Sequence, residues 1–280
     1  IIIRPDSTLP IARLAATRLK NVEKPLRLFY NQPIYRNTPD LNGRNNEYSQ
    51  MGIELLGAGG LKSDIEVLVT AIEASSSCTD DFRFEIGHAG FFKELAKLLD
   101  LPDEKKDLLK DAIESKNFAS IEELLGAHGK SEVGKAIQKL PHLFGDSDIL
   151  DTAEKYCLTY KMREIIEYMR KLYSLISELD MGDKLLMDLG FVQHNDYYSG
   201  IIFSAYSPEF GSPLLNGGRY DNLLSNFDNS MPAVGFSVNT AAITDIMLYN
   251  EKLLGTENKP EVIVYCTNGF EIKAMNKVKE

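Results

Sequence analysis

One predicted strand carries polar side chains that could bind a small ligand. In "YSQMGIELLG", residues 48–57, side chains alternate between two faces, so Gln50, Gly52 and Glu54 lie on the same face. This face presents an amide and a carboxylate over a glycine. For this strand alone, the simpler interpretation is that the polar face meets water, as half-buried antiparallel strands commonly do.

A second stretch, "NDYYSGIIF" at residues 195–203, places Tyr197 and Tyr198 directly before an apolar strand-like run. Hydroxyl groups on a buried sheet are costly unless hydrogen-bonded, so we expect something to meet them. No arginine occurs from residue 220 to the end of the chain.

Composition narrows the class of protein. The 280 residues are 44% hydrophobic and 26% charged, with a formal net charge of -10. These values are typical of a globular protein and give no basic excess of the kind that nucleic-acid binding usually requires. No apolar run reaches membrane-spanning length, so we expect no membrane contact. The chain begins without Met, and we expect its natural start to be missing.

The cysteines and histidines predict neither a disulfide framework nor a metal site. The three cysteines are widely spaced, which fits a reducing compartment, and we expect a cytoplasmic protein. The four histidines pair with no cysteine at zinc-ligand spacing. "GAGGLKSD" has neither dinucleotide nor P-loop spacing, so no cofactor is expected.

Hydrophobic periodicity predicts strands and helices up to residue 88, helices over 89–180, and mostly strands from 181. "LRLFYNQPIYRN", residues 26–37, suggests two short strands broken at Asn31–Pro33, and Ser63 with Glu66 suggests a capping box. One apolar stripe runs from Met162 to Leu179. This order indicates an α+β fold with a mainly antiparallel sheet flanked by helices and a helical insertion.

Five motifs occur in the order found in the core of class II histidyl-tRNA synthetases, which the chain resembles. They are "RPDST" (4–8), "IYRNTPDLNGRNNEYSQMGIELLG" (34–57), "NDYYSGIIF" (195–203), "GGRYDNLL" (217–224) and "AVGFSV" (233–238). The resemblance implies a class II aminoacyl-tRNA synthetase-like fold. It divides the chain into a first core part (1–88), a helical insertion (89–180), a second core part (181–255) and the start of a C-terminal segment (256–280).

The resemblance also implies a histidine pocket on the sheet. Three positions match those that hold the amino-acid ammonium group, two match those that read the imidazole, and two line the pocket. In that order they are Asp6, Thr8 and Gln50; Glu54 and Tyr198; and Tyr197 and Tyr220. A zwitterion with an imidazole needs acceptors for its ammonium and partners for both ring nitrogens, which this set supplies. Arg36 either holds the histidine carboxylate or pairs within the sheet.

The sequence departs from the synthetase pattern where the family holds ATP. The family's catalytic arginine falls on Gln193, the third-motif arginine on Ala242 and the glutamate before it on Ala241. The glutamate after the second-motif arginine falls on Thr38. Adenylate formation builds negative charge at phosphorus, and losing one preorganised donor costs on the order of 100- to 1,000-fold in rate. We therefore expect no useful adenylation.

This sequence retains the pocket residues of the synthetases and lacks their catalytic arginines. In this it resembles the regulatory subunits of ATP phosphoribosyltransferase, which are histidyl-tRNA synthetase paralogues. "FEIGHAGFFKEL", residues 84–95, is similar to that subfamily too, although a plain strand-to-helix junction with a hydrogen-bonded His88 would also explain it. The segment after residue 255 is short for an anticodon-binding domain.

That resemblance implies a non-catalytic subunit that mediates feedback inhibition by histidine in the first step of histidine biosynthesis. Its implied partners are the short catalytic subunit, in a hetero-octamer, and a second copy of itself; tRNA is not expected. Two alternatives stay open at this point: an active histidine–tRNA ligase, and another ligase on the same fold.

Overall fold

The computed structural model describes residues 3–35, 46–192, 197–208 and 210–249, with the isolated positions 264, 265, 273 and 277. Within them, eight strands form one sheet in the order β1-β2-β8-β7-β6-β3-β5-β4. All neighbours pair antiparallel except β3 and β5. The strands are β1 (Leu26–Tyr35), β2 (Glu47–Leu56), β3 (Arg83–His88), β4 (Phe144–Gly145), β5 (Leu185–Asp188), β6 (Ile201–Ser207), β7 (Phe210–Arg219) and β8 (Ala233–Asn239). The mainly antiparallel α+β architecture is therefore confirmed.

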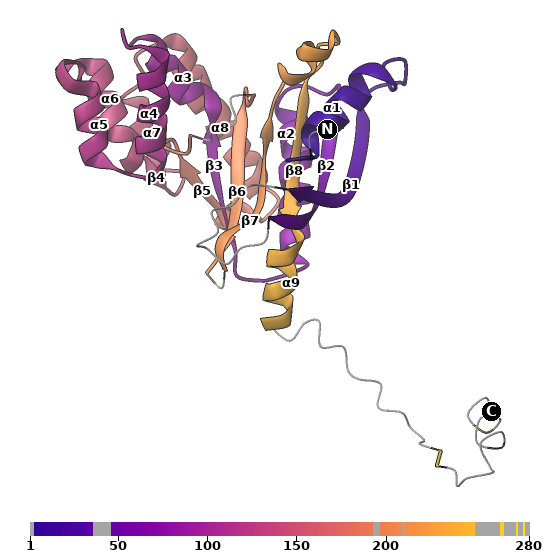
Figure 1. The fold of residues 1–280 in the computed structure, drawn as a ribbon. Helices are drawn as coiled ribbons and strands as arrows, with labels where there is room; N and C mark the ends of the chain where they lie inside the picture. Colours follow the sequence, from indigo (N-terminus) through magenta and orange to yellow (C-terminus); the bar gives the residue numbers. More distant parts are fainter. Residues whose placement is uncertain are drawn as a thin grey trace.

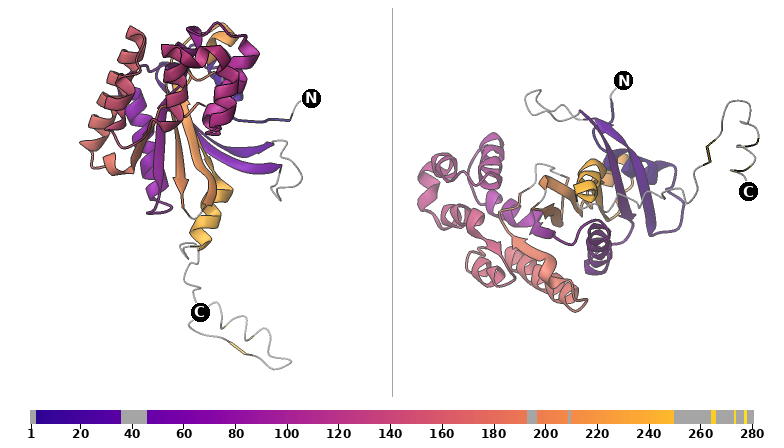
Figure 2. Two further views of the ribbon diagram at one scale, coloured as in Figure 1. Left: turned by 90° about the vertical axis from the view of Figure 1, so that its left-hand side faces the viewer. Right: turned by 90° about the horizontal axis from the view of Figure 1, so that it is seen from below.

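Helices cover the sheet and gather at one of its ends (Figures 1 and 2). The α-helices are α1 (Thr8–Thr17), α2 (Leu61–Ser76), α3 (Ala89–Lys97), α4 (Asp103–Glu114), α5 (Phe118–Leu125), α6 (Glu132–Lys139), α7 (Ile149–Glu154), α8 (Tyr160–Ser177) and α9 (Thr240–Tyr249). Short 3-10 helices are η2 (Gly126–Lys130), η3 (Leu140–His142), η4 (Gly182–Lys184) and η5 (Leu223–Phe227). Helices α3–α7 lie beyond β3 and β5, at the opposite end from β1 and β2.

The predicted break in the first strand is wrong. β1 is continuous, and its pairing with β2 runs without interruption from Leu26–Leu56 to Tyr35–Glu47. Proline has no backbone N–H, so in an interior strand, which is hydrogen-bonded to a neighbour on each side, it leaves a ladder bond unmade. Because β1 is an edge strand, Pro33 pairs opposite Ser49 without leaving a ladder bond unmade.

The predicted capping box is also wrong. α2 begins at Leu61 after Gly60, whose φ of 78° suits a glycine. The Ser63 hydroxyl donates to the Gly60 carbonyl at 2.8 Å. Glu66 instead forms an ion pair with Arg27 of β1 at 2.6 Å, so neither side chain caps the helix.

The region 89–180 is mostly helical as predicted, but it also contains β4, which pairs with β5 and extends the sheet. The apolar stripe of α8 is buried from Met162 to Ile176. Leu179 follows the helix and is half exposed. The division into two core parts and an insertion stays a prediction.

Two apolar clusters sandwich the sheet. The larger one packs α2, α3 and α8 against the strands and includes Phe84 and Phe203. The smaller one packs α1 against Tyr30, Tyr198 and Tyr220. The sheet is thus covered on both faces near α1, and this cover determines which polar side chains are withdrawn from water.

Candidate ligand cavity

A cavity of about 990 Å³ opens on the sheet face that α1 partly covers. Strands β2, β6, β7 and β8 form its floor, and the start of α1 and the segment around Tyr197 form its walls. Seven sequence-predicted pocket residues line it together: Asp6, Thr8, Gln50, Glu54, Tyr197, Tyr198 and Tyr220. The structure brings this set into one cavity, and its role in binding histidine stays a prediction.

Glu54 lies at the centre of the site and is 2% exposed. One carboxylate oxygen accepts a hydrogen bond from Thr8 Oγ1 at 2.8 Å, and the other accepts one from the Tyr220 hydroxyl. Burial raises the pKa of Glu54 to about 7, although both hydrogen bonds act in the opposite direction. Burial and the Glu54 carboxylate raise the pKa of Tyr220, so its hydroxyl stays protonated and donates.

Three glycines make room for these groups on the cavity face. A side chain at Gly235 would overlap the Glu54 carboxylate, and one at Gly52 would overlap the Tyr30 hydroxyl. A Cβ at Gly218 would lie 2.7 Å from the Tyr198 ring. Strand glycines often mark such close approach, and here they let large polar side chains lie flat over the sheet.

The simpler interpretation of the second strand, that its polar face meets water, is wrong. Gln50 and Glu54 are buried, whereas Met51 and Ile53 on the other face are partly exposed. The register continues the polar face across the sheet, from Gly52 through Ser237 and Asn216 to Ser204. A row of small polar side chains therefore floors the cavity.

Two buried polar atoms have no hydrogen-bond partner among the described residues: Gln50 Oε1, which lines the cavity, and the Tyr30 hydroxyl, which does not. Most buried polar groups are paired, so such atoms call for an explanation. Sequence reasoning missed Tyr30. The signal lay in the pairing of β1 with β2, which sets Tyr30 directly opposite Gly52, but this register is not evident from periodicity alone. A ligand in the cavity with a donor for Gln50 Oε1 would satisfy that atom.

The described wall of the cavity is acidic. Its carboxylates are Asp6, Glu47, Glu54, Glu114 and Asp245, and none of the described residues lining it carries a positive charge. Such a wall attracts an ammonium or imidazolium group and repels a triphosphate.

The two alanines at the synthetase ATP positions differ in placement. Ala241 lines the cavity, whereas Ala242 is fully buried in the larger apolar cluster. Neither methyl group can neutralise a phosphate. Whichever of the two positions faces a nucleotide, the positive charge that the synthetases supply there is missing.

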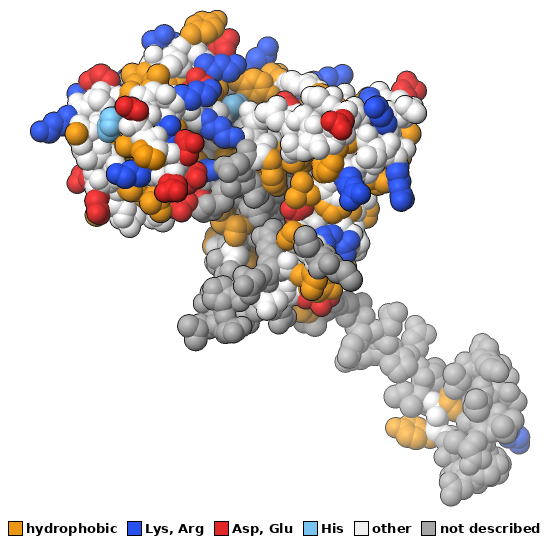
Figure 3. Space-filling view, turned by 45° about the horizontal axis from the view of Figure 1, so that its top comes forward, with side chains coloured by type: hydrophobic (Ala, Val, Ile, Leu, Met, Phe, Trp, Pro, Cys, Tyr) orange, Lys and Arg blue, Asp and Glu red, His pale blue; other side chains and the backbone are white. Residues whose placement is uncertain are grey.

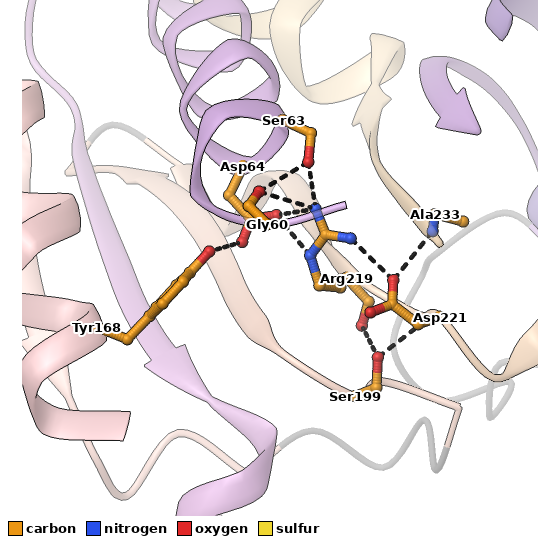
Figure 4. Close-up of polar contacts among 8 residues, drawn as sticks. All are labelled: Gly60, Ser63, Asp64, Tyr168, Ser199, Arg219, Asp221 and Ala233. Carbon is orange, nitrogen blue, oxygen red and sulfur yellow. Dashed lines mark hydrogen bonds and ion pairs between the residues drawn. The ribbon is translucent and has the colours of Figure 1, made fainter. Parts of the chain in front are cut away.

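Arg219 of the "GGRYD" motif points away from the cavity into a buried network (Figure 4). Its guanidinium donates to Asp64 at 2.8 Å, to Ser63 at 2.6 Å and to Asp221 at 2.8 Å. Asp64 also accepts from the Tyr168 hydroxyl. Burial acts against the charge on Arg219, but hydrogen bonds and attraction from Asp64 and Asp221 raise its pKa overall. This cation joins α2, α8 and β7 and is not available to a ligand.

Other predicted positions lie elsewhere. Arg36, Thr38 and Gln193 lie outside the described residues. His88 ends β3 and caps α3, where its Nδ1 accepts from Gly90 N at 3.1 Å. Burial lowers the pKa of His88 to about 4, so it stays neutral at pH 7. Locally, this is the plain strand-to-helix junction with a hydrogen-bonded histidine.

The comparisons with known proteins agree with one another. Residues 1–243 match the family model described as histidyl-tRNA synthetase. The ATP phosphoribosyltransferase regulatory subunit of Clostridium kluyveri is 38% identical over 94% of this chain and 68% of its own length. That of Clostridium acetobutylicum is 39% identical over 89% and 63%. The chain thus spans about two thirds of the length of these curated relatives.

Solved structures share the fold. A structure described as an ATP phosphoribosyltransferase regulatory subunit/histidyl-tRNA synthetase, from Bacillus halodurans, superposes with a TM-score of 0.78 at 32% identity. It covers 87% of this chain and 64% of that one. The sheet and its helices therefore form a class II aminoacyl-tRNA synthetase-like fold. Separately, no helix in the described part of the chain has the length and apolar character needed to cross a membrane.

Proposed function

Because the chain belongs to the family of ATP phosphoribosyltransferase regulatory subunits, which is built on the histidyl-tRNA synthetase fold, we propose that it is a non-catalytic subunit that binds histidine. In this role it is required by the short catalytic subunit and transmits feedback inhibition in the first step of histidine biosynthesis. The role places the protein in the cytoplasm.

The buried Glu54 site is the observation that carries the proposal. Glu54, held between Thr8 and Tyr220, offers an acceptor to a cationic or N–H-bearing ring. Gln50 Oε1, which is buried without a partner among the described residues, lines the same cavity and would gain a partner from a ligand. An imidazole with an ammonium group supplies donors of both kinds. On the family resemblance alone, we propose that Arg36 meets the histidine carboxylate.

Isothermal titration calorimetry with L-histidine tests this site. A hydrogen bond to a charged group contributes about 1.5–3 kcal/mol, so Glu54→Gln should weaken binding by roughly 10- to 150-fold. Glu66→Gln is the matched control, because Glu66 lies on the exposed side of α2 and pairs with Arg27. Equal affinities in the wild type and Glu54→Gln would exclude this cavity as the histidine site.

A non-catalytic role is supported by the cavity's charge. Amino-acid adenylation needs cations at the reacting phosphate. The charged side chains among the described residues of the wall are all carboxylates, and Arg219 is hydrogen-bonded to Asp64 on the other side of the sheet. Histidine-dependent ATP–pyrophosphate exchange should therefore be undetectable, and robust exchange would favour the alternative of an active histidine–tRNA ligase.

We propose the short ATP phosphoribosyltransferase catalytic subunit as the partner, in a hetero-octamer that also contains a dimer of this chain. The names of the curated relatives support the partnership, and the assembly follows from the family resemblance. Light scattering after size-exclusion chromatography of the mixed subunits measures the mass of the complex. Activity of the catalytic subunit, with and without this chain and histidine, measures the regulation.

A further inference from the structure

A second hollow, the lysine pocket, has the opposite charge. It measures about 330 Å³ and lies between α3, α4 and the strand β6. Its lining residues are Ala89, Phe92, Lys93, Ala96, Lys97, Asp103, Lys106, Asp107, Lys110, Val192, Tyr198 and Ile202. Figure 3 shows Lys and Arg side chains gathered on this face, where the helices meet the sheet. Four lysines against two aspartates stand out in a chain whose net charge is -10.

The lysines nearest the interior of the lysine pocket are Lys106 and Lys110, whereas Lys97 lies at the rim, where its side chain is 70% exposed and pairs with Glu94. Lys110 is only 8% exposed, and the Lys106 side chain is 24% exposed. Asp103, 3.6 Å from Lys106, has a side chain that is 99% exposed. Solvent screens a carboxylate at the rim more strongly than it screens ammonium groups inside a hollow. The interior therefore keeps a net attraction for anions.

The floor of the lysine pocket is apolar. Phe92, Val192 and Ile202 line it, and Tyr198 borders it. An apolar floor lowers the local dielectric and strengthens each charge interaction above it. It also suits the hydrocarbon or ring portion of a ligand.

We propose that the lysine pocket binds a phosphate-bearing small molecule. Several ammonium groups around so small a volume require an anion with more than one charge, which a phosphate or pyrophosphate group supplies. Lysine commonly binds phosphate in this manner, as a point charge with three N–H donors.

Binding in the lysine pocket reaches the large cavity through Tyr198. Lys93 Nζ donates to the Tyr198 carbonyl at 2.7 Å, and Tyr198 lines both hollows. An anion that draws Lys93 toward itself alters this hold on Tyr198, so the anion and histidine change each other's affinity by the same factor. This coupling rests on the proposed function, whereas the anion site does not.

Titration with sodium pyrophosphate tests the site, with sodium chloride holding the ionic strength constant. Lys106→Gln should weaken pyrophosphate binding about tenfold or more, because it removes one charge-assisted contact. Lys135→Gln is the matched control, since Lys135 forms the same i,i+3 pair on α6, with Glu132, away from the lysine pocket. Ala96→Met fills the hollow without changing its charge and should weaken binding similarly. Circular dichroism verifies that each variant is folded.

Each result decides the proposal. Weaker binding in Lys106→Gln and Ala96→Met, with Lys135→Gln unchanged, supports it. No binding to the wild type, or equal loss in all three variants, overturns it, because the attraction would then be general surface charge. Histidine titrated separately keeps the two proposals distinguishable: pyrophosphate binding without histidine binding refutes only the histidine site.

Discussion

Glu54→Gln should flatten the pH dependence of folding stability between about pH 4.5 and 7. In the folded protein burial raises the pKa of Glu54 from 4.5 to about 7. Between these values the native state therefore binds more protons than the unfolded state, and stability falls as pH rises. The amide of the variant cannot titrate, so the variant loses this contribution. It retains the shape of the side chain, and the neighbouring hydroxyls can either donate or accept.

The magnitude follows from the difference of about 2.5 between the two pKa values. At 1.36 kcal/mol for each pKa unit, the free energy of unfolding falls by about 3 kcal/mol over the whole range. Between pH 5.5 and 8, a window that lies above the isoelectric point of about 5.1, about 2 kcal/mol of this fall remains. That change is large against a total stability of roughly 5–15 kcal/mol.

Urea unfolding without histidine, followed by circular dichroism at half-unit pH steps from 5.5 to 8, measures the effect. The wild type and Glu54→Gln should differ in slope, and Glu66→Gln should follow the wild type, because Glu66 is partly exposed and Arg27 lowers its pKa, so that it does not titrate in this window. Parallel curves for the wild type and Glu54→Gln would refute the reasoning. The carboxyl would then titrate alike in both states, and its burial would not control its charge.

Three further predictions concern the walls of the cavity and the network behind it. Tyr30→Phe should leave the ligand-free protein as stable or up to about 1–3 kcal/mol more stable in urea unfolding, since the buried hydroxyl has no partner among the described residues. Gly235→Ala should destabilise the protein by about 1–3 kcal/mol and abolish histidine binding, because its methyl group overlaps the Glu54 carboxylate. Tyr168→Phe should cost about 1–3 kcal/mol in urea unfolding, because a buried carboxylate on α2 loses a hydrogen bond, whereas Tyr173→Phe on the same helix should have little effect.

Sequence patterns predicted the elements that are determined locally. The stripe of α8 needed only its own 3.6-residue period, and the alternation of β2 needed only its period of two. Neither pattern predicts the order of the strands in the sheet. The continuity of β1 depends on its edge position, which makes Pro33 harmless. A local pattern therefore predicts a helix or a strand. It does not predict the neighbouring elements, which determine whether an unfavourable residue such as Pro33 is tolerated.

The candidate site shows the same limit more sharply. Residue types and the family resemblance selected Glu54 and Tyr220, which the structure joins by a hydrogen bond. The burial of the polar face of β2 could not be predicted, because it arises from α1 packing over Tyr30 and Tyr198. Tyr30 itself was missed, since only strand register places it opposite Gly52.

The distribution of charge is consistent with the proposal that this chain binds an amino acid without activating it. Adenylation requires a carboxylate and a triphosphate to be held by cations within one cavity. Here the described cavity wall carries carboxylates, Arg219 is held by Asp64 and Asp221 on the far side of the sheet, and the nearest cluster of lysines lines a separate hollow. Tyr198 lies between the two hollows and belongs to both. In the proposed arrangement the histidine site and the anion site meet at Tyr198, which keeps the reacting groups of the two ligands apart but lets each ligand influence the binding of the other.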